Sequence, residues 1–151
     1  MAQKYGHLNF GNLLSMMPET KAADVTLEAY RKQLITKGEE MATKFRTNYE
    51  KFVTDIKDKS LTPKVQEARE AALGQEQQSI MAYEQEISQK LQAKRQELLK
   101  PIVEKAEKAI SDLGKEKGYQ FIFDTSTFNA VLFVRDSDDV TPLIKAKLGI
   151  K

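Results

Sequence analysis

The 151-residue sequence has no cysteine and no tryptophan, and it contains one histidine, four prolines and seven glycines. Without cysteine the chain cannot form a disulfide framework, a zinc ribbon or a thiol nucleophile. With a single histidine it cannot form a His-cluster metal site or a His–His acid–base pair. No apolar run approaches the roughly 20 residues that a membrane-spanning helix needs.

A strong charge of either sign is also absent, since 24 Lys+Arg against 22 Asp+Glu leave a formal net charge of +2. Nucleic-acid-binding proteins usually have a clear basic excess, so nucleic acid is not expected as a partner. Charged residues make up 30% of the chain and hydrophobic residues 40%. This balance is typical of long solvated helices.

Composition divides the chain into three predicted segments. The β-branched and aromatic clusters lie in residues 1–18 and 112–151, whereas residues 19–111 are highly charged and poor in glycine. In the middle segment the bulky apolar residues repeat every eleven residues, as at Tyr30, Met41 and Phe52. This spacing corresponds to about 3.67 residues per turn and predicts helices with one apolar stripe.

The middle segment is predicted to be an antiparallel helical hairpin with its tip near residues 58–63. Thr62 suits the N-cap of a helix and Pro63 its first position, and a residue that precedes proline disfavours the helical conformation. The first helix should therefore end by about Ser60. A hairpin this long is expected to protrude, because the rest of the chain is too small to cover it.

The apolar stripe is expected to form mainly the packed seam between the two arms. The outgoing arm nevertheless carries more methionine and aromatic residues than the facing arm can cover. Exposed apolar surface often marks a binding site on a soluble protein. The candidate binding residues are Met41, Phe45, Tyr49, Phe52, Met81 and Tyr83.

Pro101 interrupts the returning arm, but the stripe continues across it in register. We therefore expect one helix with a kink, because proline lacks the amide hydrogen of the helical hydrogen bond. This makes Pro101 a candidate hinge. The alternative is that a separate helix begins at Pro101.

The N-terminal segment is predicted to contain a strand over Lys4–Phe10, with Gly6, Leu8 and Phe10 on one face. Gly11-Asn12 should break this strand, and a short helix over Leu13–Met17 should stop at Pro18.

In the C-terminal segment the long helix should end near Gly114 and Gly118. Two strands, Tyr119–Asp124 and Ala130–Arg135, should then form a β-hairpin. After the polar loop Asp136–Asp139, Thr141-Pro142 should cap a final helix.

These terminal segments are too small to be comfortably stable alone. Their few strands would leave open edges, and a last strand that is apolar on both faces needs cover on both sides. Oligomerisation through the small sheet would satisfy both needs. The candidate interface residues are Leu8, Phe10, Phe121, Ile122, Phe123, Val131 and Phe133. The predicted fold is thus α+β and predominantly α, with a small β-sheet body and a long protruding helical hairpin.

This arrangement resembles the Skp/OmpH-like periplasmic chaperone family. The resemblance is carried by Lys4–Phe10 with Gly11–Pro18 and by the run Gln96–Lys151. It is most specific at Glu97–Ile102, Glu116–Asp124 and Leu143–Ile150.

The resemblance implies a homotrimer whose three hairpins, or tentacles, surround a cavity. Unfolded outer-membrane proteins would be held there without ATP and without a cofactor. It leaves open a peripheral contact with the membrane or with lipopolysaccharide. The cluster of cationic residues proposed to bind lipopolysaccharide in some family members does not map onto this sequence. The start at Met1 has no apolar signal segment, which fits either a cytosolic protein or a start in place of a removed signal. The family favours the periplasm, and Ala2-Gln3 is similar to the start of a mature secreted chain.

The competing function is an oligomeric coiled-coil scaffold or adaptor that binds a specific folded partner. An enzyme is not expected. His7 alternates with apolar neighbours in a predicted strand and has the pattern of a structural residue. Asp136, Asp138 and Asp139 lack the spacing of a calcium loop. Gly114–Gly118 ends a helix, whereas a phosphate loop opens one. We therefore predict no catalytic, cofactor-binding or metal-binding residue.

Overall fold

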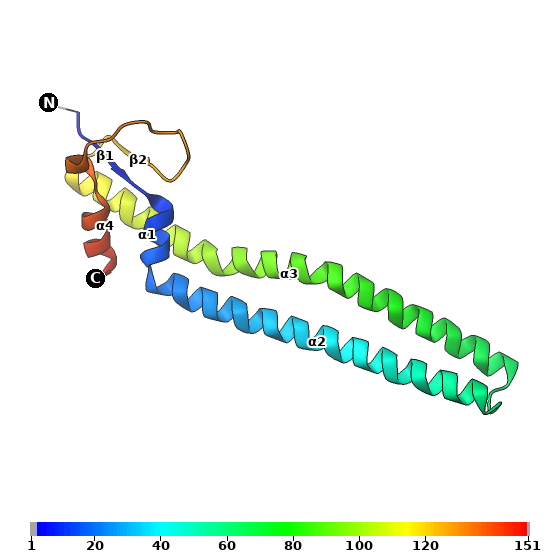
Figure 1. The fold of residues 1–151 in the computed structure, drawn as a ribbon. Helices are drawn as coiled ribbons and strands as arrows, with labels where there is room; N and C mark the ends of the chain where they lie inside the picture. The colour runs from blue at the N-terminus through cyan, green and yellow to red at the C-terminus, as the bar shows by residue number, and fades with distance from the viewer. Residues whose placement is uncertain (1–2, 151) are drawn as a thin grey trace. The chain divides into compact units, whose positions relative to one another are not determined.

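The computed structural model describes residues 3–150, which form two compact units. Unit 1 lies within residues 1–26 and 95–151, and unit 2 comprises residues 27–94. Met1, Ala2 and Lys151 lie outside the described residues, and with them Ala2 of the Ala2-Gln3 start expected of a mature chain. The elements are β1 (Tyr5–Leu8), α1 (Phe10–Met16), α2 (Pro18–Lys57), α3 (Pro63–Lys117), β2 (Phe121–Asp124), the short 3-10 helix η1 (Asp136–Asp138) and α4 (Thr141–Leu148) (Figure 1). This predominantly helical composition with a small sheet confirms the predicted fold class; the division into three segments stays a prediction.

Unit 2 is an antiparallel pair of arms from α2 and α3, which lie side by side (Figure 1). The hydrogen bonds between the arms define the direction. The Tyr83 hydroxyl donates to the Leu34 carbonyl at 3.1 Å, and the Asn48 amide donates to Glu76 at 2.8 Å. Partner numbers on α3 fall as those on α2 rise, as in an antiparallel hairpin.

The tip of the hairpin lies where the sequence predicts it. Helix α2 ends at Lys57 and α3 begins at Pro63. The Thr62 hydroxyl accepts a bond from the Val65 amide at 3.4 Å, which is a weak version of the expected N-cap. Lys59 adopts the left-handed conformation, with φ of 50°, in the turn between the helices.

Helix α3 runs without interruption through Pro101, so the prediction of one continuous helix is confirmed. It ends at Lys117, and Gly118 follows with φ of 68°, a conformation that glycine adopts without steric cost. Gly114 lies inside the helix and does not end it. The bend predicted at Pro101 stays a prediction.

Unit 1 has a core formed by β1, α1, the start of α2, the last turns of α3 and α4. Residues spaced three or four apart on α3, including Ala106, face this core, and the small alanine side chain lets the other helices approach closely. The core contains Leu8, Leu13, Met17, Ala23, Ile102, Ala106, Ala109, Leu113, Val140 and Ile144. The apolar stripe predicted on the returning arm thus continues into the core of unit 1.

The sheet differs from the prediction. β1 pairs with β2 in parallel, with Tyr5 opposite Phe121 and Leu8 opposite Asp124, and the described residues contain this one two-stranded sheet. The predicted β-hairpin is wrong, because residues 130–135 form no strand. A strand requires a neighbour for its hydrogen bonds, and among the described residues β2 pairs with β1 while no strand lies beside residues 130–135.

The structure also corrects the boundaries or caps of four short elements. Strand β1 ends at Leu8, and the Asn9 side chain accepts from the Asn12 amide at 2.8 Å, so Phe10, Gly11 and Asn12 belong to α1. The second strand begins at Phe121, not at Tyr119. Helix α4 has Val140 as its N-cap, and the Asp139 carboxylate, not Thr141, caps its start by accepting from the Thr141 amide at 2.8 Å.

Close packing under β1 leads to a first prediction. A methyl group added at Gly6 would lie 2.7 Å from Cγ1 of the buried Val140 and 3.1 Å from the Tyr119 ring. Gly6→Ala should therefore lower the free energy of unfolding by about 1–3 kcal/mol in urea denaturation, since overpacking forces the neighbours to shift. Gly74→Ala is the matched control, because Gly74 is helical with nothing within 4 Å. That change should be neutral or stabilising by roughly 0.5–1 kcal/mol. Equal stability of the two variants would contradict the prediction.

Candidate interaction surfaces

One face of the small sheet carries exposed aromatic rings. Successive side chains of a strand alternate between faces, so the parallel register places Tyr5 beside Phe121 and Phe123. The centroid of the Phe121 ring lies 6.0 Å from that of Tyr5 and 6.0 Å from that of Phe123. Phe121 remains 60% exposed and Phe123 47% exposed. The other face, with Gly6 and Ile122, packs toward the core of unit 1.

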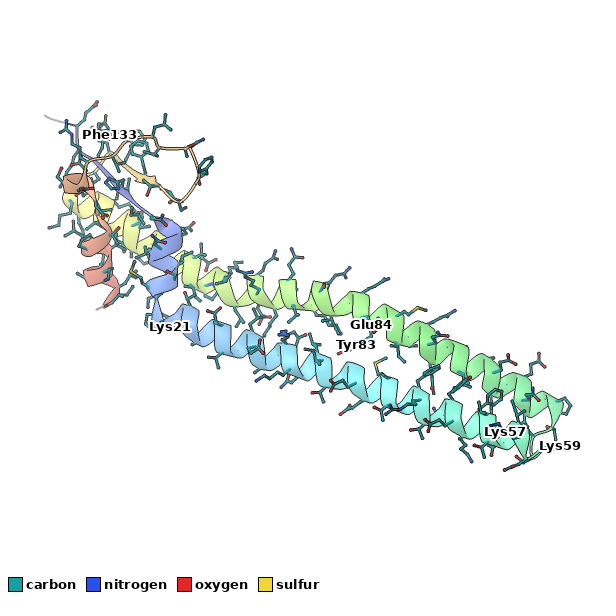
Figure 2. The ribbon with its side chains drawn as sticks, in the orientation of Figure 1. Lys21, Lys57, Lys59, Tyr83, Glu84 and Phe133 are labelled. Atoms are coloured by element: carbon teal, nitrogen blue, oxygen red, sulfur yellow. The ribbon has the colours of Figure 1, made fainter. Side chains whose placement is uncertain are left out.

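An apolar loop lies next to this aromatic face. Phe128 is 89% exposed and Phe133 81% exposed, and Leu132 between them is equally open (Figure 2 labels Phe133). The His7 ring bonds to the Arg135 carbonyl at 2.8 Å through Nε2, which attaches the end of the loop to β1. The loop and the sheet together enclose an open groove of about 620 Å³. Unit 1 therefore exposes a continuous apolar surface of the kind that proteins bury against a partner.

Most residues predicted at an interface lie on or beside this surface. Phe121, Phe123 and Phe133 are exposed and Val131 is half-buried there, whereas Phe10 and Ile122 pack against the core of unit 1. Leu8 differs, because it is 2% exposed inside the chain's own core and offers almost no surface to a second chain. Tyr5, Phe128 and Leu132 are also exposed in unit 1, and none of them was predicted at an interface. Tyr5 could have been found from strand alternation, but the two loop residues carry no local signal.

The stripe on the hairpin separates into seam and surface residues. Phe52 and Tyr83 are buried between the arms, so they belong to the seam and present little surface to a partner. Met41 and Phe45 are half-buried, whereas Tyr49 and Met81 are each 51% exposed. The Phe45 and Tyr49 rings stack at 6.3 Å between centroids. Partly exposed methionine and aromatic side chains thus follow the arms of unit 2.

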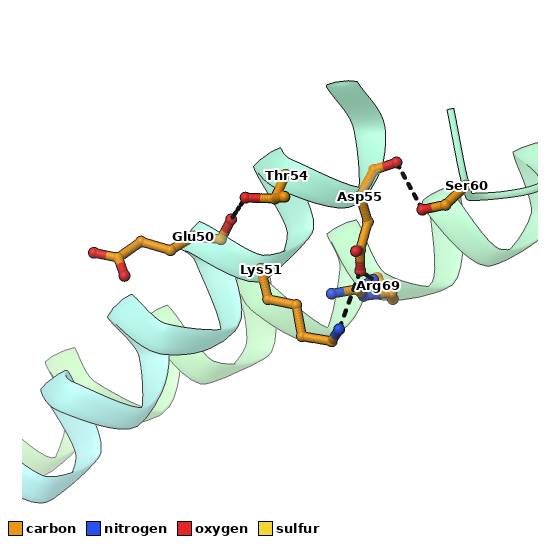
Figure 3. Close-up of polar contacts among 6 residues, drawn as sticks. All are labelled: Glu50, Lys51, Thr54, Asp55, Ser60 and Arg69. Atoms are coloured by element: carbon orange, nitrogen blue, oxygen red, sulfur yellow. Dashed lines mark hydrogen bonds and ion pairs between the residues drawn. The ribbon is translucent and has the colours of Figure 1, made fainter. Parts of the chain in front are cut away.

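Charged groups connect the two arms near the tip (Figure 3). Arg69 of α3 donates to the Asp55 carboxylate of α2 at 2.5 Å, and Lys51 lies 3.6 Å from the same carboxylate. The hydrogen bond from Arg69 lowers the pKa of Asp55, and the charge of Lys51 lowers it further. The Ser60 hydroxyl donates to the Asp55 carbonyl at 3.0 Å and ties the turn to the end of α2.

The lowered pKa of Asp55 gives a prediction for acid conditions. Because the unfolded carboxyl titrates near roughly 3.9, this contact stabilises the tip above that pH and is lost as pH falls through the lower folded pKa. Hydrogen exchange over residues 52–70, corrected for intrinsic rates, should stay constant from neutral pH down to about 5 and accelerate below about 4. Arg69→Gln should accelerate it already at neutral pH. Asp58→Asn, which removes the other tip carboxylate, is the control and should leave the profile unchanged; an equal effect of both variants would contradict the role of Asp55.

The candidate hinge, Pro101, is exposed and lies beside Ala22 and Leu98 in a shallow groove between α2 and α3 within unit 1. The Lys105 ammonium donates to the Glu19 carboxylate across the same two helices, and this bond lowers the pKa of Glu19. A residue at the junction of two packed helices is well placed to influence their bending. The hinge role stays a prediction.

The described part of the chain contains no cluster of three or more His, Asp or Glu side chains suited to a metal ion. Within residues 3–150 no helix is both long and apolar enough to cross a membrane. The acidic residues singled out in the sequence have local contacts, since the Asp139 carboxylate accepts from the Thr141 amide and the Asp136 carbonyl accepts from the Asp139 amide. His7 makes the structural contact to Arg135 described above.

Together these features define a class of protein, namely a small α+β unit with an exposed aromatic face and two long helices that form an antiparallel hairpin. The chain matches the family model described as outer membrane protein (OmpH-like) over residues 4–148 and belongs to that family. No curated protein matches the sequence. A crystal structure from Caulobacter crescentus, provisionally assigned as an outer membrane chaperone (OmpH-like), has the same fold with a TM-score of 0.79 at 16% identity. The match covers 98% of this chain and 85% of that chain.

Proposed function

We propose that the protein is an ATP-independent holdase chaperone of the periplasm, which keeps unfolded outer-membrane β-barrel proteins from aggregating. The observation that carries this proposal is the row of partly exposed methionine and aromatic side chains along the hairpin of an OmpH-like chain. Methionine and aromatic surfaces adapt to many apolar partners without a defined epitope. Unfolded barrel strands offer such partners, because they expose alternating apolar residues and unpaired backbone groups.

The proposal includes a homotrimer. The aromatic face of the sheet and the loop with Phe128, Leu132 and Phe133 form more exposed apolar surface than one small unit normally leaves in water. The groove between loop and sheet offers room for a segment of another chain. A trimer built through this surface would bring three hairpins around one client. Many weak contacts would then add by multivalency, which raises affinity without any single strong site.

The test is light scattering after a urea-unfolded outer-membrane protein is diluted into buffer with and without the chain. A holdase suppresses the scattering near one trimer per client, and addition of ATP changes nothing. An unfolded protein of unrelated sequence is the second client. If the chain suppresses the aggregation of neither client, the holdase proposal is overturned. If the chain binds only a folded partner, the adaptor is favoured.

A further inference from the structure

Unit 2 contains an apolar groove between the arms that the proposed function does not by itself assign. Ile35 and Ala42 of α2 and Ile80 and Ile87 of α3 form its walls, and the buried ring of Tyr83 lies at its base. Figure 2 shows Tyr83 directed from α3 toward α2, where its hydroxyl bonds to the Leu34 carbonyl. The volume is about 270 Å³, below the roughly 300 Å³ at which pockets for drug-sized ligands begin. The groove therefore has room for one large apolar side chain.

Glycine at position 38 keeps this groove open. A Cβ atom there would lie 3.6 Å from Cε1 of Tyr83, in ordinary van der Waals contact, so the seam itself does not require glycine. Helix α2 keeps a residue of low helix propensity at this point, where a larger side chain would occupy the groove. The opening is thus a property of the sequence and not only of loose packing between two helices.

The charges that line the groove are both negative. Glu39 of α2 and Glu84 of α3 stand at its two sides, and both residues are exposed. Two lysines lie near the Tyr83 ring. Lys37 and Lys90 approach the Tyr83 ring at 5.3 and 5.6 Å, but neither lines the groove, and Lys90 pairs with Glu86 at 3.4 Å. An apolar opening between two carboxylates is complementary to an apolar side chain with cations on both sides.

We propose that this groove is a client-binding subsite for an extended segment with an apolar residue flanked by lysine or arginine two positions away on each side. In an extended chain, residues two apart point to the same side and lie roughly 6.6 Å from one another. The central side chain would enter the groove over Tyr83, and the flanking cations would face Glu39 and Glu84. The inference rests on the proposed holdase function and adds a preference for basic apolar segments, although the chain as a whole carries a small positive charge.

The test uses fluorescein-labelled nine-residue peptides that differ only in a central five-residue core. The cores are lysine–serine–leucine–serine–lysine, the same sequence with glutamate for lysine, and the lysine peptide with serine for leucine. Fluorescence anisotropy at low salt should show that the first peptide binds about threefold to tenfold more tightly than either of the others. The preference over the glutamate peptide should shrink as salt screens the exposed charges. Equal binding of the three peptides would overturn the proposal.

Two variants locate the effect. Glu39→Gln with Glu84→Gln should remove the preference for lysine over glutamate, whereas Glu50→Gln with Glu70→Gln makes the same change of net charge outside the groove and should retain it. Ala42→Leu should fill the groove and weaken binding of the leucine peptide until it equals binding of the serine peptide. Loss of the preference in both glutamate pairs would overturn the assignment to the groove.

The client assay separates this inference from the function on which it rests. If the wild-type chain suppresses aggregation but no peptide depends on Glu39 and Glu84, the holdase stands and the subsite fails. If the peptides depend on these residues while the chain suppresses no aggregation, the holdase fails and the groove remains a binding site for basic apolar segments.

Discussion

Phe133→Asp should convert the proposed trimer into monomers, as measured by sedimentation equilibrium at micromolar concentration. Phe133 is 81% exposed on the loop beside the sheet, so a trimer assembled through this surface would bury it. A carboxylate without a partner in an apolar interface costs several kcal/mol, and symmetry repeats that cost in every subunit. The expected result is a mass of one chain with an unchanged helical circular dichroism spectrum.

Ser137→Asp is the matched control for this variant. It adds the same charge in the same part of the chain, but Ser137 lies in the polar η1 segment, with its hydroxyl directed to Asp138. The control should keep the mass of the unsubstituted protein. A wild-type chain that is already monomeric, or a Phe133→Asp variant that remains trimeric, would contradict an interface at this loop.

Tyr49→Ser combined with Met81→Ser should weaken the binding of an unfolded outer-membrane client at least about tenfold. Both side chains are about half exposed in unit 2, so their removal should leave the packed seam intact. In a trimer the two changes remove six apolar contacts around one client, and the losses add because the contacts act together. The measurement is the concentration of protein that halves the light scattering of the diluted client.

Val25→Ser combined with Leu143→Ser is the control for this experiment. It likewise replaces two exposed apolar side chains by serine, but both belong to unit 1. The control should suppress aggregation as the unsubstituted chain does. If both double variants weaken suppression equally, general surface hydrophobicity and not the hairpin carries the binding. If neither does, the exposed residues of the arms are not the client surface.

Local chemistry explains why the hairpin could be predicted from the sequence. The eleven-residue spacing covers three helical turns of one segment, and the N-cap and proline at Thr62-Pro63 and the glycine at 118 act on adjacent residues. Residues close in the sequence therefore suffice to predict the helices and their ends. The continuity of α3 through Pro101 was also predictable, because the apolar stripe keeps its register across the proline.

The candidate surfaces depended more on contacts between distant residues. Phe52 and Tyr49 both belong to the apolar stripe of the outgoing arm, yet Phe52 is buried and Tyr49 is half exposed. The difference arises from which residues of the opposite arm face each of them. A periodic pattern indicates the apolar face of a helix, but it does not show how much of that face a partner helix covers.

The sequence by itself determined the α+β class, the long antiparallel hairpin with its tip and the aromatic residues of β2, because these follow from periodicity and from capping within a few residues. The tertiary structure alone decided that β1 and β2 pair in parallel, that Asn9 starts a helix where a strand was expected, and that residues 130–135 form an exposed loop. The parallel pairing of β1 with β2 joins residues more than a hundred positions apart, so the local apolar pattern of residues 130–135 could not show whether a partner strand would lie beside them.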